Sequence, residues 1–448
     1  MKKLQILVPH YKSPQEELSN LLDMIYVQRN INFDDIGVII GNDGDLSIID
    51  DDFLNYYRQK FDIEYHIFEH AGVSSTRNRL LDLATSDFVM FCDDDDTLLS
   101  NRSIQIILEC IKNHTNANVF RSRYKFEFKN EIETILNDVG ETEMFSNIHG
   151  VIIRRDFLIK NNIRFYENIN VHEDSVFNIL MGSYLHYENQ EEIIINSQTY
   201  IYCHNDNSIC KFNSDNKFDF VIRTTDVLIN SRYELFKDLI NRKQFNHLTH
   251  NINSQTVVLY RFLKKLELAQ KFDPSYIKPI YIHTALCFKR LLPIIRNTIG
   301  MISVSEFDEL CYNLFKDENF DIGTSYTNDF NNIVNYVDSL SFEQDPITKW
   351  TLDKNTGELT YNQADVAYFI KNRTVLIDNN VDDISSIYYS RGVDFETNNK
   401  EFKMNIQDNN EETENSIVNK YSHTSTYRDI NELIDEYASK NNCEIINI

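Results

Sequence analysis

The chain has 448 residues, of which 42% are hydrophobic and 12% aromatic, and its formal net charge is −25 at pH 7. This apolar content excludes an intrinsically disordered protein, and the length exceeds what one hydrophobic core usually serves, so we expect two or three domains. The acidic balance disfavours nucleic acid and anionic lipid as partners, because both repel a negative surface.

Cysteine usage and hydropathy indicate the compartment. The seven cysteines are scattered and form no C-x-x-C pair, which argues against a zinc knuckle and a disulfide framework. Cys203, His204 and Cys210 resemble a partial zinc site, but a fourth ligand is missing. No apolar run reaches the about 18 residues that span a bilayer, and the N-terminal LQILVP is too short for a signal peptide. We expect a cytoplasmic protein that could work at the inner face of the membrane.

Apolar strands and helices alternate along the first part of the chain. Predicted strands cover residues 4–11, 36–41, 63–69 and 87–92, and helical segments such as STRNRLLDLA at 75–84 lie between them. Continuous apolar strands that alternate with helices are typical of a mostly parallel sheet covered on both faces. The sequence therefore predicts a Rossmann-like α/β domain at the N-terminus.

The helix after the first strand has a start signal. Ser13 is predicted as its N-cap, Pro14 as its first helical residue, and Glu16 as the partner of Ser13 in a capping box. An apolar stripe with helical spacing follows, formed by Leu18, Leu21, Leu22 and Ile25.

The later segments have different patterns. Residues 118–128 and 132–138 predict a hairpin, and residues 154–165 predict a short helix followed by a strand. Apolar residues at helical spacing dominate residues 218–340, and a last helix is predicted at 428–440.

These patterns predict three regions. An N-terminal domain would cover residues 1–217, a mainly helical region residues 218–345, and a small α+β C-terminal module residues 346–448. The apolar faces of the helical region must be buried on the first domain, in a homo-oligomer or at a membrane surface, and the acidic charge favours the first two.

Four consecutive aspartates, Asp93–Asp96, follow the predicted strand at 87–92. Asn42–Asp45 follows an earlier strand, and ligands of open parallel sheets bind at the carboxyl ends of their strands. The aspartates could form an acidic N-cap over a helix start. Alternatively they hold Mg²⁺ or Mn²⁺, which carboxylates bind together with substrate phosphates such as those of a nucleoside diphosphate.

Several segments occur in the order found in one enzyme family. They are ILVPHYK, IIGNDGD, HAGVSSTRNRLLDLATSDFVMFCDDDD, IHGVIIRRDFLIKNNIRFYENINVHEDSVFNILM and YIYCHNDNSI. Together they resemble the nucleotide-sugar domain of the family 2 inverting glycosyltransferases, which have the GT-A fold, over roughly residues 3–210. Three positions depart from the family pattern, namely Lys12, Asn42 and Asp45, and they leave the identity of the nucleotide base open.

The resemblance implies a role for each matching residue. Pro9 and Tyr11 would line the base pocket, Asp43 would bind the uracil edge, Arg77 would steady the nucleotide, Asp93 or Asp94 would bind the ribose, Asp95 would bind Mn²⁺ or Mg²⁺, Asp174 would be the general base with Glu173 beside it, and His204 and Ser208 would approach the metal or the diphosphate.

Several of these residues also have a purely structural interpretation. Arg77 could be a surface cation, Glu173 and Asp174 a solvated helix start, His204 a hydrogen-bonding loop residue, and Tyr11 a core residue.

The implied activity is transfer of a sugar from a UDP-sugar to a hydroxyl of a surface glycan, such as a polysaccharide or a teichoic-acid-like polyol phosphate. Asp174 would take the proton of the hydroxyl as it attacks the anomeric carbon in line, which inverts that centre. A phage-type enzyme acting on modified DNA would need a basic groove. A catalytically inactive module that binds a sugar nucleotide is the third alternative.

Overall fold

The structure is a computed structural model of the chain. It describes residues 2–45, 49–129, 134–138, 147–169, 173–187, 190–203, 229, 231–242, 245–270, 274–299, 303–315, 325–352, 359–361 and 444–446. The chain divides into two compact units, one formed by Met1–Lys211 with Arg428–Ile448 and the other by Phe212–Tyr427. The predicted boundaries between the three sequence regions remain a prediction.

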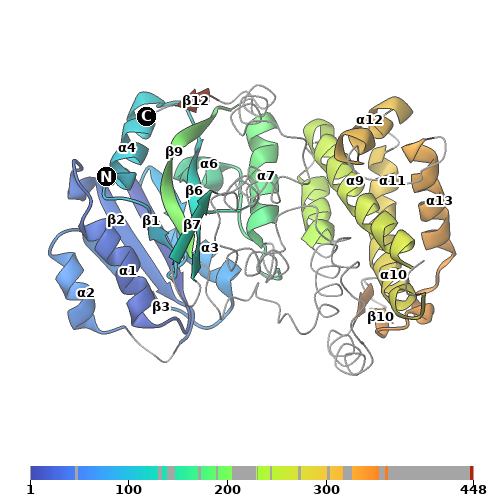
Figure 1. Cartoon of the computed structure of the whole chain (residues 1–448), viewed down its shortest axis with the longest axis horizontal. Coiled ribbons are helices and arrows are strands. Elements are labelled where there is room, and N and C mark those ends of the chain that lie inside the picture. The colour runs from blue at the N-terminus through green and yellow to red at the C-terminus, as the bar shows by residue number, and fades with distance from the viewer. Residues whose placement is uncertain are drawn as a thin grey trace, which may run out of the picture. The chain divides into compact units, whose positions relative to one another are not determined.

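A mixed sheet forms the centre of the first unit (Figure 1), with strand order β12-β9-β6-β8-β4-β1-β2-β3. Its strands are β1 (Leu4–His10), β2 (Ile36–Asn42), β3 (Asp62–Ile67), β4 (Phe88–Phe91), β6 (Val119–Lys129), β8 (Val151–Arg154), β9 (Glu192–Cys203) and β12 (Glu444–Ile446), with β5 (Thr97–Leu98) on β9 and β7 (Thr134–Asp138) on β6. β3, β2, β1 and β4 run parallel to their neighbours, whereas β8 is antiparallel to β4 and β6. The predicted α/β architecture is confirmed.

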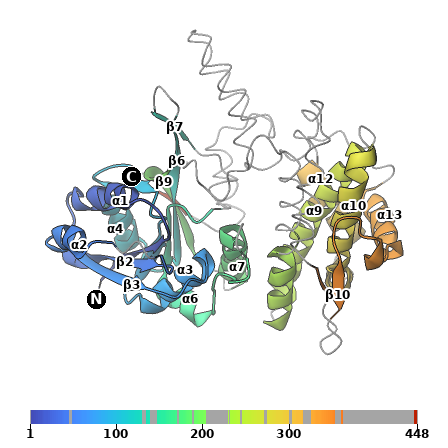
Figure 2. The same cartoon turned by 90° about the horizontal axis from the view of Figure 1, so that it is seen from below.

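Helices cover both faces of this sheet. They are α1 (Gln15–Tyr26), α2 (Asp51–Arg58), α3 (Val73–Leu83), α4 (Ser103–Asn113), α6 (Arg155–Lys160) and α7 (Glu173–Tyr187). Figure 2 shows α1 and α4 on one face and α3 on the other. Every residue of β1 and β2 is buried, as expected for central strands covered on both sides.

The start of α1 differs from the prediction. Pro14 is the cap residue, the helix begins at Gln15, and no side chain caps it. The Ser13 hydroxyl instead donates to Asp94 Oδ1 at 3.0 Å. A carboxylate is a stronger acceptor partner than a neutral capping contact, so the capping-box prediction was wrong.

The other local predictions had mixed outcomes. The apolar stripe of α1 is buried, and β6 and β7 form the predicted antiparallel hairpin. The short helix α6 is present, but the strand expected after it is wrong. Asn162 there has a left-handed φ of 48°, and Phe165 N donates to the Asn78 side chain instead of to a strand.

The end of the chain contributes to the main sheet. Residues Glu444–Ile446 pair in parallel with Ile193–Ile195 of β9. A module confined to residues 346–448 therefore does not account for this strand. The helix predicted at 428–440 lies outside the described residues.

The second unit is mainly helical, as predicted. Its elements include α9 (Phe245–Ala269), α10 (Pro274–Lys289), α11 (Leu292–Ile299), α12 (Val304–Phe315), α13 (Tyr326–Ser339) and a hairpin of β10 (Trp350–Leu352) with β11 (Leu359–Tyr361). Tyr260 packs in its core against Phe315 and Phe330, with ring centroids 5.2 and 5.3 Å from its own. Within the described residues, we find no helix that is both long and apolar enough to cross a membrane.

Candidate active site

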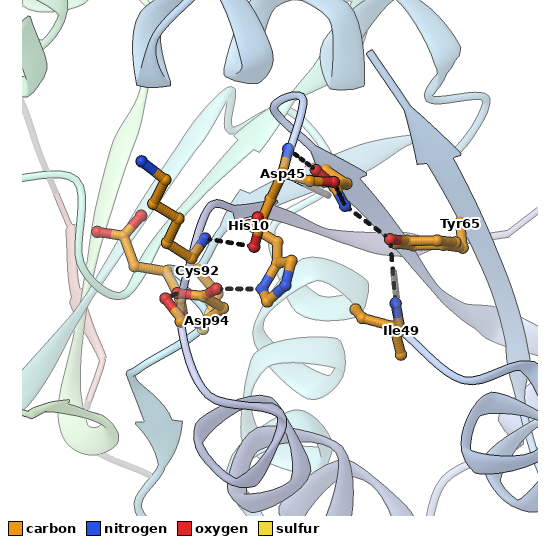
Figure 3. Close-up of polar contacts among 10 residues, drawn as sticks. His10, Asp45, Ile49, Tyr65, Cys92 and Asp94 are labelled. Atoms are coloured by element: carbon orange, nitrogen blue, oxygen red, sulfur yellow. Dashed lines mark hydrogen bonds and ion pairs between the residues drawn. The ribbon is translucent and has the colours of Figure 1, made fainter. Parts of the chain in front are cut away.

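Three polar segments gather at one edge of the sheet. β2, β1 and β4 are parallel neighbours, so Asn42–Asp45, His10–Lys12 and Asp93–Asp96 all follow the carboxyl ends of adjacent strands. Figure 3 shows His10, Asp45 and Asp94 lying close together there. This edge is where an open parallel sheet binds its ligands.

Asp94 is a buried link between the acidic loop and β1. Its Oδ2 lies 2.5 Å from His10 Nδ1 (Figure 3), and its Oδ1 accepts from the Ser13 hydroxyl. Burial raises the pKa of the Asp94 carboxyl, although His10 and Ser13 oppose that rise. Both oxygens have protein partners, and the ribose contact of Asp94 remains a prediction.

Asp96 holds β9 against the loop. The Tyr200 hydroxyl donates to Asp96 Oδ2 at 2.5 Å, and Cys203 N donates to Oδ1 at 2.8 Å. His149 Nδ1 lies 3.2 Å from Oδ2. The Asp96 side chain is buried, and this burial raises its pKa. Neither Asp96 nor His149 could be assigned a specific role from the sequence, because their partners lie far along the chain.

We expect Asp96→Ala to lower the free energy of unfolding by about 3 kcal/mol. The substitution leaves the buried Tyr200 hydroxyl and Cys203 amide without their acceptor, and such orphaned donors are expensive. Urea denaturation followed by circular dichroism measures the change. Asp95→Ala, one residue away, is the matched control, and equal midpoints for the two variants would contradict the structural role of Asp96.

Asp95 is the aspartate of the run that lacks a partner. It is half-buried, and the structure gives it no hydrogen bond or ion pair to any described residue. Burial, followed by the negative charges of Asp96, Asp93 and Asp94, raises its pKa to about 9. A carboxylate held among like charges without compensation is the arrangement that a bound cation would relieve.

Asp93, Asp96 and His149 form a second possible metal cluster. One ligand atom from each lies within 4.8 Å of the others. His149 stacks on Tyr202, with centroids 4.4 Å apart, and Asp96 raises the pKa of His149 in spite of its burial. Because Asp96 already accepts from Tyr200 and Cys203, we regard this cluster as the weaker fit to a cation.

The predicted general base lies at the first turn of α7. Glu173 and Asp174 begin this helix, and Asp174 Oδ1 accepts from Ser175 N at 2.7 Å. Burial and the neighbouring Asp174 carboxylate raise the pKa of Glu173, against the opposing effect of Arg77, to about 7. Arg77 Nη1 donates to Glu173 Oε1 at 2.7 Å.

The predicted base pocket has an exposed ring at its edge. Tyr11 is 39% exposed and stacks on His70, with ring centroids 4.6 Å apart and an interplanar angle of 16°. Pro9 lies in β1 opposite Gly41 and is buried. The sequence did not single out His70, which adds a second ring to this edge.

Asp43 is buried and holds the loop before α3. Its two oxygens accept from Ala71 N at 2.9 Å and Gly72 N at 2.8 Å, and His70 Nδ1 lies 2.9 Å from Oδ2. Gly44 has a φ of 79°, and a Cβ there would lie 2.7 Å from His70 N, so the turn requires glycine. The uracil contact of Asp43 remains a prediction.

The departures from the family pattern contact one another. Asp45 N donates to Asn42 Oδ1 at 2.7 Å, and Lys12 N donates to Asp45 Oδ2 at 3.1 Å. Asn42 Nδ2 donates to the Tyr65 hydroxyl at 2.9 Å. Lys12 adopts a left-handed φ of 59°, and its ammonium lies 4.7 Å from the Tyr11 ring centroid. His204 and Ser208 lie outside the described residues.

Comparisons with solved structures find weak similarity. Residues 1–349 of S. aureus TarS align with a TM-score of 0.48 at 15% identity, covering 80% of this chain and 96% of that one. The same TarS segment in complex with UDP-GlcNAc gives 0.48 at 16% identity, with the same coverage. The mannosyltransferase PcManGT from Pyrobaculum calidifontis, in complex with GDP-Man and Mn²⁺, aligns with a TM-score of 0.38 at 13% identity, covering 70% of this chain and 88% of that one.

The family comparison is specific to the first unit. No curated protein matches the chain. Residues 5–178 match the family described as Glycosyl transferase family 2, a range that contains the acidic loop, Arg77 and the Glu173–Asp174 pair. The strands in this range form the α/β sheet that the GT-A resemblance implied. Residues 5–178, which are less than half of the chain, are thus similar to glycosyl transferase family 2.

Proposed function

We propose that the protein is a metal-dependent inverting glycosyltransferase. It would move a sugar from a nucleoside-diphosphate sugar, a UDP-sugar in our proposal, to a hydroxyl of a polysaccharide, a teichoic-acid-like polyol phosphate or another surface glycan. The observation that carries the proposal is the division of the acidic run. Asp93, Asp94 and Asp96 have partners, whereas Asp95 is half-buried and has no partner among the described residues.

Asp95 would hold Mn²⁺ or Mg²⁺. Its oxygens fit a hard cation, because the three neighbouring carboxylates already raise the electrostatic energy of its charge. The bound cation would neutralise charge on the departing diphosphate. Asp93 is the second candidate ligand, because Arg77 bonds only to its Oδ1 and leaves Oδ2 for a cation.

Asp174 would be the general base. Ser175 N fixes its Oδ1, and the structure gives its Oδ2 no partner among the described residues. Oδ2 could therefore accept the proton of an acceptor hydroxyl as the oxygen attacks the anomeric carbon. A single displacement of this kind needs no covalent enzyme intermediate and inverts the anomeric centre.

The setting of the reaction is part of the proposal. Cys92, Cys110, Cys287 and Cys311 are buried free thiols, which suits a reducing, cytoplasmic compartment. A glycan acceptor at the inner face of the membrane would fit this location. The net charge of −25 continues to disfavour DNA as acceptor.

A donor panel tests the proposal. The full chain is incubated with UDP-, GDP-, ADP- and dTDP-sugars, with Mn²⁺, Mg²⁺ or EDTA, and nucleotide release is measured. We expect slow hydrolysis of one or a few donors that EDTA stops. If no nucleotide sugar is hydrolysed and calorimetry detects no nucleotide binding with metal present, the proposed function is wrong.

A further inference from the structure

Arg77 joins the acidic loop to the first turn of α7. Its side chain is 3% exposed, its Nη2 donates to Asp93 Oδ1 at 2.7 Å, and its Nη1 donates to Glu173 Oε1 at 2.7 Å. Asp93 follows β4, whereas Glu173 begins α7, so the guanidinium connects two elements that are far apart in sequence. A buried cation shared by two carboxylates fixes both, because removing it leaves two charges uncompensated.

The same face of α3 holds the segment that precedes α7. The Ser74 hydroxyl donates to Ile169 O at 3.1 Å, Asn78 Nδ2 donates to Phe165 O at 2.9 Å, and Phe165 N donates to Asn78 Oδ1 at 3.0 Å. Ser74 and Asn78 lie three residues before and one residue after Arg77, so the three share one face of the helix. α3 therefore binds the chain from Phe165 onward, and Arg77 extends these contacts to α7.

The charges around Glu173 give Arg77 a second effect. Glu173 and Asp174 are adjacent carboxylates at one helix start, and like charges at this separation repel each other. Arg77 compensates Glu173 directly. Asp174 is then free to point elsewhere, with Ser175 N as the donor to its Oδ1.

We propose that Arg77 is a positioning residue, which locks the first turn of α7, and with it Asp174, against the acidic loop by binding Glu173 and Asp93. This inference rests on the proposed function, because it takes Asp174 as the general base. It differs from the role that the sequence resemblance implied, in which Arg77 steadies the nucleotide. Both nitrogens at the end of the side chain are already bonded to protein carboxylates.

The test separates positioning from nucleotide binding. Turnover, donor KM and the calorimetric Kd for UDP with Mn²⁺ are measured for the full chain and for Arg77→Gln and Arg77→Lys. We expect Arg77→Gln to lower kcat by about 10²-fold, the usual effect of a misplaced catalytic group, and Arg77→Lys to recover part of the loss. The donor KM and the Kd for UDP should stay within about threefold of the wild-type values.

Arg79→Gln is the matched control. Arg79 lies on the same helix, and its Nη1 donates to Glu69 O at 2.6 Å, away from Glu173. We expect this variant to keep wild-type turnover. A fall in UDP affinity that parallels the loss of turnover in Arg77→Gln would overturn the proposal and restore the nucleotide role, and unchanged turnover in Arg77→Gln would also overturn it.

A double-mutant cycle with Glu173→Gln tests the route of the effect. If Arg77 acts through Glu173, the double variant should lose little more turnover than Arg77→Gln alone, whereas multiplying losses would contradict the proposal. Should Arg77→Gln fail to fold, the cycle is run with Arg77→Lys. A wild-type chain that turns over no donor would count against the proposed function, while UDP calorimetry of the variants would still decide whether Arg77 contacts the nucleotide.

Discussion

Asp95→Asn should abolish the divalent-dependent binding of UDP and at the same time make the metal-free protein more stable. The first effect follows if Asp95 is the principal oxygen ligand of the cation, because an amide is a weaker ligand than a carboxylate. The second follows from its surroundings, since burial and the neighbouring carboxylates raise the pKa of Asp95 from 3.8 to about 9. In that range the unfolded chain releases the proton before the folded chain does. The folded state is therefore destabilised progressively as the pH rises from about 4 to about 9.

Calorimetry with UDP and Mn²⁺ measures the first effect, and thermal unfolding in EDTA at several pH values measures the second. Asp156→Asn is the control, because the Asp156 side chain is 90% exposed and should affect neither quantity. Unchanged UDP affinity in a folded Asp95→Asn variant would remove the metal assignment. A metal-free variant less stable than wild type at pH 8 would mean that Asp95 has a stabilising partner.

The fold of the first unit could be predicted because its signals are local. The apolar runs at 4–11 and 36–41 became the buried strands β1 and β2 almost residue for residue. Period and length of an apolar run decide between strand and helix without knowledge of distant residues. Failures arose where a distant partner replaced a local one. Ser13 had a suitable capping position, but its hydroxyl donates instead to the carboxylate of Asp94, 81 residues later.

The division of labour within the acidic run could not be predicted for the same reason. The run itself shows four identical side chains. Their roles are set by partners at large sequence separation, such as His10 for Asp94, 84 residues away, and Tyr200 for Asp96, 104 residues away. Nothing in the sequence marks Cys203, His10 or Tyr200 as a partner of an aspartate. Their pairing with Asp96 and Asp94 is visible only in the folded structure. This is why the acidic loop could be identified from the sequence, whereas the aspartates with structural partners could not be distinguished from Asp95, which has none among the described residues.

Asp174, like Asp95, has a carboxylate oxygen without a partner among the described residues, and its substitution should also have a large effect on activity. Asp174→Asn should lower kcat by about 10² to 10⁴-fold, the usual contribution of a general base, and leave UDP affinity nearly unchanged. Asparagine keeps the shape of the side chain and an oxygen for the Ser175 amide, so the start of α7 should be preserved. Steady-state kinetics with the preferred donor, together with UDP calorimetry, separate the two quantities. Asp82→Asn is the control, because the Asp82 side chain is 64% exposed and pairs with Arg164.

Two outcomes would move the general base away from Asp174. Near-normal turnover in Asp174→Asn would show that another group accepts the proton. A Glu173→Gln variant that loses more turnover than Asp174→Asn would point to Glu173, and the pH profile would then support that choice. Because the pKa of Glu173 is raised to about 7, a Glu173 base would lose activity as the pH falls through 7, where protonation removes its acceptor oxygen. The bond from Arg77 to Glu173 Oε1 opposes this outcome, since the guanidinium favours the charged form of that carboxylate and so lowers its proton affinity.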